Sequence, residues 1–148
     1  MVCLGNICRS PLAQGILNRK IQKAGLDWQV DSAGTADYHV GSAPHKLSQK
    51  VARINDIDIS NQKCRKFVRE DIVRFDKIYV MDENNYQDVK EISNNNWNPL
   101  KVDFLLNELY PLENRNVPDP WYGTEPDYHD VFKLIDDACD KICKNNKE

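Results

Sequence analysis

The sequence predicts a single α/β domain built as a three-layer sandwich, in which a four-stranded parallel twisted sheet carries helices on both faces. Two observations support this fold class. Short apolar runs alternate with segments whose apolar residues recur at helical spacing, which is typical of parallel strands joined by helices. The 148 residues are enough for one domain with one sizeable core, and they contain neither an internal repeat nor a linker. We therefore expect residues 1–148 to form one domain.

The strands are short and mostly buried. Segment 77–81 is the clearest of them, because it reads Lys-Ile-Tyr-Val-Met and is rich in residues that favour strands. The predicted strands are 1–4, 29–32, 77–81 and 100–104.

Helical periodicity fills most of the remaining chain. Gly25 ends the first helix, as glycine commonly does. The predicted helices are 11–24, 43–55, 84–92 and 127–143, with a helical turn at 71–74. Apolar stripes expected to face the core are Leu12, Ile16, Leu17 and Ile21 in the first helix, Leu47, Val51 and Ile54 in the second, and Val131, Leu134, Ile135, Ala138 and Ile142 in the last. Loops are expected at 35–44 and at 107–124, which holds three of the seven prolines.

Composition excludes several classes of function. A net charge of −3 argues against nucleic acid or an anionic membrane as the main partner. The chain contains neither an apolar run long enough to span a membrane nor a signal region at its start. Five cysteines at irregular spacing do not form a disulfide framework, so we expect a reducing, cytoplasmic location.

The segment 3–11 reads Cys-Leu-Gly-Asn-Ile-Cys-Arg-Ser-Pro and carries the chemistry. Such a loop can curl so that successive N–H groups point at one anion, and Gly5 and Asn6 tolerate the left-handed backbone that this needs. Arg9 can donate two parallel hydrogen bonds to a phosphoryl group. Pro11 suits a first helical position, which would place the loop at a helix N-terminus, where anions and the thiolate form of Cys3 are favoured. The expected phosphate-binding residues are Leu4, Gly5, Asn6, Ile7, Cys8 and Ser10.

The same pattern also has an ordinary structural interpretation. An isolated Cys-x5-Arg pattern arises often by chance, with the cysteine as a small core residue and the arginine in solvent. The full string before a helix is far more specific, and it lacks the Gly-Lys-Ser/Thr ending of a nucleotide-binding loop. We therefore favour cysteine-based phosphate-ester chemistry.

This string resembles the signature of the low-molecular-weight protein tyrosine phosphatases. The resemblance extends along nearly the whole chain, through Asp-Ser-Ala-Gly-Thr at 31–35, Met-Asp-Glu-Asn at 81–84 and Asp-Pro-Trp-Tyr-Gly at 119–123. It implies hydrolysis of aryl phosphate monoesters through a phosphocysteine formed on Cys3. The implied substrate is a tyrosine-phosphorylated protein or a small aryl phosphate, with no cofactor and no metal.

A phosphatase of this kind also needs an acid for the leaving oxygen. Asp119 is the candidate, because prolines restrain its loop on both sides and α/β folds gather such loops at one edge of the sheet. An Asp-Pro pair is also a common turn former, but the resemblance identifies this one as the acid loop. It likewise implies that Tyr38, Trp121 and Tyr122 line the pocket, where flat apolar faces suit an aryl group.

Three polar residues are candidates for a supporting role. Ser10 can donate to the Cys3 thiolate, while Asn6 and Ser32 can hold the loop in its strained shape; ordinary turn polarity explains them equally well. The resemblance implies that Cys8 could trap oxidised Cys3 as a disulfide, and a role as a small filler residue stays open beside this.

The chain departs from the family pattern at two positions. Only Met1 and Val2 precede the nucleophile, so we expect either a very short first strand or a start further upstream. Gln62 stands where the family often has histidine, so no role is carried over to it. The histidines and the remaining cysteines lack ligand spacing, and we predict no metal site.

Three alternatives remain beside the phosphotyrosine reading. An arsenate reductase would need relay thiols, and 82–98 contains no cysteine. For an arginine phosphatase, the resemblance implies threonine at the position of Ile7 and a smaller residue at the position of Trp121. This chain has neither. A phosphate-binding or redox-sensing module would not need both Cys3 and Asp119. We expect a monomer and leave a weak dimer open.

Overall fold

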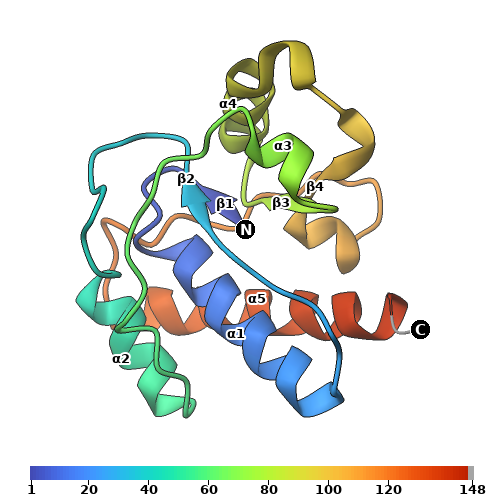
Figure 1. The fold of residues 1–148 in the computed structure, drawn as a ribbon. Coiled ribbons are helices and arrows are strands. Elements are labelled where there is room, and N and C mark those ends of the chain that lie inside the picture. Colours follow the sequence, from blue (N-terminus) through green and yellow to red (C-terminus); the bar gives the residue numbers. More distant parts are fainter. Residues whose placement is uncertain (147–148) are drawn as a thin grey trace.

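A computed structural model, which describes residues 1–146, has a four-stranded sheet in which every pairing is parallel (Figure 1). The strand order is β2-β1-β3-β4, so the chain crosses over the sheet between neighbouring strands. The strands are β1 (Val2–Cys3), β2 (Ala33–Gly34), β3 (Ile78–Val80) and β4 (Val102–Phe104).

Helices cover both faces of this sheet, which confirms the predicted three-layer α/β fold. In Figure 1, α1, α2 and α5 lie on one side of the sheet, and α3 and α4 lie on the other. Two groups of buried apolar side chains match these layers, one packed around α1 and α5 and the other around α4 and the strands. The helices are α1 (Arg9–Ala24), α2 (Lys46–Ile54), α3 (Asp71–Arg74), α4 (Glu83–Ser93) and α5 (Glu125–Asn145), with 3-10 turns η1 (Asn94–Asn96), η2 (Pro99–Lys101) and η3 (Leu105–Glu108).

The predicted second strand at 29–32 is wrong, because β2 lies just after it. The cause is the length of β1, which spans only Val2–Cys3 and pairs in register with Ala33 and Gly34. Residues 29–32 instead line a cleft of about 870 Å³ beside Met1, at the amino-terminal end of β1. Their alternating pattern suits a strand, but β1 does not extend far enough to pair with them.

Most of the predicted helical stripes are buried. Ile54 is an exception: it is the last residue of α2 and is 57 % exposed, because the helix ends before that turn is covered. Leu134 in α5 is only partly buried against the core. None of the helices in the described part of the chain is long and apolar enough to cross a membrane.

The carboxyl ends of the central strands meet at one edge of the sheet. The N–H of Thr35, after β2, donates to the carbonyl of Cys3 (3.0 Å), and the N–H of Val117 donates to the carbonyl of Met81, after β3 (2.7 Å). Gly34 has no room for a side chain, since an added Cβ would lie 2.8 Å from the carbonyl oxygen of Leu4. This edge therefore gathers segments that are far apart in the sequence.

Candidate active site

The loop from Cys3 to Ser10 joins β1 directly to α1. It turns at Asn6, whose φ of 56° is left-handed, and the N–H of Asn6 donates back to Sγ of Cys3 (3.3 Å). The turn therefore directs backbone N–H groups into the loop, as an anion cradle requires. No side chain caps the start of α1 in the described structure, so its first N–H groups face the same space.

The predicted helix start needs a correction. Arg9 and Ser10 are already helical, which makes Pro11 the third residue of α1 rather than the first. The difference is small in energy, because the first four N–H groups of a helix have no intrahelical acceptor and proline lacks only one of them. The loop still ends at the helix N-terminus, as expected.

Cys3 is buried and has a hydroxyl at its sulfur atom. Its Sγ lies 3.1 Å from Oγ of Ser10. The Asn6 side chain donates to Oγ of Ser10 (2.7 Å) and to Oγ of Ser32 (2.9 Å), and Ser32 in turn donates to Oε1 of Gln14 (2.6 Å). The three polar residues singled out from the sequence thus form one network around the sulfur.

Arg9 is almost fully buried and is held by acceptors from distant segments. One of its terminal nitrogens donates to Oδ2 of Asp82 (2.8 Å) and to the carbonyl of Val117 (2.9 Å), and the other lies 3.7 Å from Oδ2 of Asp119. Burial acts to lower the pKa of Arg9, but Cys3 and the two carboxylates outweigh it and raise the pKa. The guanidinium therefore carries its charge in a fixed orientation.

Asp82 was not predicted as a site residue. It caps α4 by accepting from the N–H of Asn85 (2.8 Å) with one oxygen, and it binds Arg9 with the other. Its position directly after the buried strand β3 was the available signal, because the carboxyl ends of parallel strands share one edge. Neither the ion pair nor its partner can be read from local spacing.

Asp119 lies at the mouth of the loop, with 45 % of its side chain exposed. Its Oδ1 accepts from the N–H of Trp121 (3.1 Å), which ties the carboxylate to its own turn. The fold thus brings Asp119 beside Arg9, although 110 positions separate them in the sequence. This carboxyl group is therefore accessible from the mouth of the loop.

The aromatic residues lie at different depths. Trp121 is 39 % exposed, whereas Tyr38 (73 %) and Tyr122 (96 %) lie largely in solvent and can contact a ligand only at the rim. Two histidines bracket Trp121, because the rings of His39 and His45 both lie 5.5 Å from it.

His39 was missed by sequence reasoning. Its ring lies against the loop from Cys3 to Ser10, with Cδ2 only 3.3 Å from where a Cβ on Gly5 would be, so it forms an inner wall that Tyr38 does not. The only signal was its place next to Tyr38, since a histidine in a loop has many ordinary explanations.

The remaining loop residues contribute mainly backbone. Ile7 and Cys8 are buried, while Leu4 is partly exposed. Sγ of Cys8 lies 3.5 Å from the hydroxyl of Tyr128, and burial raises the pKa of the Cys8 thiol to about 11. The carbonyl of Ile7 accepts from the N–H of His45 (2.8 Å), which ties the loop to the start of α2.

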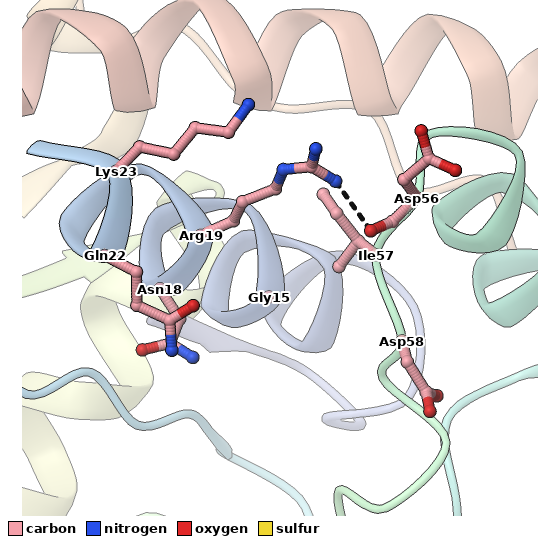
Figure 2. Close-up of a pocket in the computed structure, with 8 residues that line it drawn as sticks. All are labelled: Gly15, Asn18, Arg19, Gln22, Lys23, Asp56, Ile57 and Asp58. Atoms are coloured by element: carbon pink, nitrogen blue, oxygen red, sulfur yellow. Dashed lines mark hydrogen bonds between the residues drawn. The ribbon is translucent and has the colours of Figure 1, made fainter.

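Other concave or acidic features of the described residues lie outside this loop. A shallow pocket of about 480 Å³ runs along α1, where Arg19 donates to the carbonyl of Asp56 (2.6 Å) (Figure 2). Arg19 also donates to the carbonyl of Asn55 (3.0 Å). Its lining residues are Gly15, Asn18, Arg19, Gln22, Lys23, Asp56, Ile57 and Asp58. An acidic cluster on α5 consists of Asp136, Asp137 and Asp140, and Lys20 already pairs with two of its carboxylates.

Comparison with known proteins agrees with this geometry. The family model described as low molecular weight phosphotyrosine protein phosphatase matches residues 1–148. The low molecular weight protein-tyrosine-phosphatase PtpA of Staphylococcus epidermidis is 35 % identical over 142 residues, covering 95 % of this chain and 88 % of its own.

Solved structures show the same fold. The protein tyrosine phosphatase of Entamoeba histolytica, solved with Hepes in its active site, superposes with a TM-score of 0.87 at 32 % identity, covering 97 % of this chain and 92 % of its own. The Drosophila arginine phosphatase DARP superposes with a TM-score of 0.89 at 27 % identity, covering 99 % and 96 %. The match over the whole chain shows that this protein belongs to the low molecular weight phosphotyrosine protein phosphatase family.

Proposed function

We propose that the protein hydrolyses phosphate monoesters of tyrosine, on proteins or on small aryl phosphates, by two displacements at phosphorus. The observation that carries this is the meeting of three groups at one loop. Cys3 begins the loop, Arg9 ends it, and the carboxylate of Asp119 lies 3.7 Å from Arg9. Nucleophile, anion clamp and proton donor are the parts that such a reaction requires.

In the first displacement the Cys3 thiolate attacks phosphorus and the P–O bond to the phenol breaks. Arg9 and the loop N–H groups bind the three remaining phosphoryl oxygens as charge builds on them. Asp119 gives its proton to the departing phenolate oxygen, so the phenol leaves neutral. The products of this step are a phenol and a phosphocysteine.

In the second displacement water attacks the phosphocysteine. Asp119, now a carboxylate, takes a proton from the water as the new P–O bond forms and the P–S bond breaks. Ser10, 3.1 Å from the sulfur, can donate to the thiolate as it departs. Inorganic phosphate is released and both catalytic groups return to their starting states.

Two residues bear on the choice of phosphotyrosine over phosphoarginine. Ile7 fills the core under the loop and Trp121 offers a flat face at its mouth, and both favour an aryl leaving group. The arginine phosphatase among the structural relatives makes phosphoarginine the comparison substrate of choice. We also place the enzyme in the cytoplasm, because its nucleophile has to remain reduced. We expect it to act as a monomer.

The test compares wild type, Cys3→Ser and Asp119→Asn on para-nitrophenyl phosphate, a phosphotyrosine peptide and a phosphoarginine peptide. We expect wild type to turn over the first two substrates and Cys3→Ser to be inactive while still binding vanadate, since Arg9 and the loop amides remain. Activity of Cys3→Ser above a few per cent would refute the assignment of the nucleophile. A preference for phosphoarginine would refute the assignment of the substrate.

A further inference from the structure

Cys64 lies between the phosphate loop, which runs from Cys3 to Ser10, and the loop that carries Tyr38 and His39. It is buried, and its main chain is bound to the second of these loops. Its N–H donates to the carbonyl of Ser42 (2.8 Å), and its carbonyl accepts from the N–H of Gly41 (2.9 Å). Its side chain points the other way, and Sγ donates to the carbonyl oxygen of Asn6 (2.7 Å).

That carbonyl belongs to a peptide group of functional importance. A trans peptide is planar, and its C=O and N–H point in opposite directions. When Cys64 holds the Asn6 carbonyl outward, the N–H of Ile7 in the same peptide is turned inward, toward the space that the phosphoryl group would occupy. Asn6 is also the left-handed residue of the loop, with φ of 56°, a conformation that needs support from its surroundings.

We propose that Cys64 is a positioning residue for catalysis: its S–H, bound to the Asn6 carbonyl, fixes the peptide that presents the Ile7 N–H to the phosphoryl oxygens. This rests on the phosphatase function proposed above and adds a residue outside the loop to its machinery. The neighbouring Arg65 supports the same residue through its backbone, whose N–H donates to Oδ1 of Asn6 (3.0 Å).

The thiol remains a donor over the working range of the enzyme. Burial, with the nearby Cys3 sulfur as a smaller contribution, raises the pKa of Cys64 to about 11. At neutral pH the sulfur therefore carries its proton. A thiolate there would repel both the carbonyl oxygen and the nucleophile, so protonation is required for the contact.

The experiment uses three variants of the full chain. Cys64→Ala removes the donor, whereas Cys64→Ser keeps a hydroxyl in its place, and neither disturbs the backbone bonds to Gly41 and Ser42. Cys139→Ala is the matched control, because Cys139 is also buried but lies in α5, away from the phosphate loop. Calorimetry with inorganic phosphate measures anion affinity, thermal unfolding measures stability, and kcat and KM are measured on aryl phosphates with good and poor leaving groups.

We expect Cys64→Ala to lower phosphate affinity and kcat/KM about tenfold, the usual effect of one buried hydrogen bond. The loss should be similar for good and poor leaving groups, since the loop amides act on the phosphoryl oxygens and not on the departing phenol. Cys64→Ser should recover most of the loss, and Cys139→Ala should leave kcat/KM and phosphate affinity unchanged even if it lowers the unfolding temperature.

Two results would overturn the proposal. One is Cys64→Ala with wild-type phosphate affinity, and the other is a loss in Cys64→Ser as large as that in Cys64→Ala. Because phosphate affinity is measured without turnover, this test is separate from that of the phosphatase function, which wild-type activity decides.

Discussion

At the scale of single residues, Arg9 depends on Asp82 for its orientation. A buried guanidinium needs acceptors for its N–H groups. Asp82 supplies a charged acceptor to Arg9, whose terminal nitrogen lies 2.8 Å from Oδ2 of the carboxylate. Asp82→Asn keeps an oxygen acceptor and a good helix cap, so α4 should still form. We expect kcat/KM to fall about ten- to hundredfold, the effect of weakening a hydrogen bond to a charged group.

Asp88→Asn is the matched control for this change, because Asp88 lies on the same helix and accepts from Thr35 (3.1 Å) rather than from Arg9. It should keep wild-type kinetics on para-nitrophenyl phosphate. Equal kinetics for the Asp82 and Asp88 variants would show that Arg9 holds its place without Asp82.

The residues that the sequence could identify are those close together in the chain. Cys3, Arg9 and Ser10 belong to one turn, so their spacing alone constrains their geometry. Asp82 and His39 reach the site only through strand order and loop packing, which local patterns do not encode. Asp119 is as distant, and its identification required the family resemblance as well as its Pro-flanked loop.

At the scale of elements, the loop that carries Asp119 is held in place by Trp121. Trp121 packs between His39 and His45, and His45 stacks on Tyr128 of α5 at 5.3 Å, so the loop is attached to both α2 and α5. This docking keeps Asp119 near Arg9 while leaving its carboxylate exposed. A proton donor at the mouth of a site is placed to reach a leaving oxygen.

Asp119→Asn should therefore slow hydrolysis by roughly 10²–10⁴-fold, the contribution of a positioned proton donor. The loss should shrink for aryl phosphates with more acidic phenols, because a better leaving group needs less protonation. Asp127→Asn serves as the control, since Asp127 caps α5 by accepting from the N–H of Thr124 (2.7 Å). Wild-type rates for Asp119→Asn on a poor leaving group would exclude Asp119 as the acid.

Elements were predictable where their own pattern decides them, as in the buried stripe of α1. The second strand was misplaced because pairing depends on a partner. Residues 29–32 alternate as a strand should, yet β1 begins only at Val2 and pairs with Ala33 and Gly34 alone. The side chain of Ile54 was misassigned for a similar reason, since burial at a helix end depends on what packs over it.

At the scale of the whole molecule, buried thiols make the free energy of unfolding depend on pH in the alkaline range. Burial raises the pKa of Cys8 from 9.0 to about 11. Below pH 9 the Cys8 thiol holds its proton in both the folded and the unfolded state, so its contribution to stability is fully present. Between pH 9 and 11 the unfolded state loses its proton first, and the free energy of unfolding falls as pH rises.

Denaturant unfolding of wild type and Cys8→Ala across this pH range should show a shallower decline for the variant. Buried groups away from Cys8, such as Tyr79, titrate identically in both proteins and cancel in the difference, whereas Tyr128 contacts Cys8 and is part of the measured effect. Parallel pH curves for the two proteins would contradict the assigned environment of Cys8.

The overall architecture was the most predictable property, because alternating strands and helices in one chain of this length permit few arrangements. The depth of the pocket walls was not, since exposure of Tyr38 and Tyr122 depends on how two separate loops turn.

The most direct test of the account is to trap the covalent intermediate. Asp119→Ala is mixed with para-nitrophenyl phosphate, whose good leaving group allows the first displacement, and is then quenched in acid and digested for mass spectrometry. The missing base slows hydrolysis of the phosphocysteine, so phosphate should be found on Cys3, and none should be found in Cys3→Ser/Asp119→Ala. Release of nitrophenol without any phosphorylated Cys3, or phosphate on another residue, would contradict the proposed mechanism.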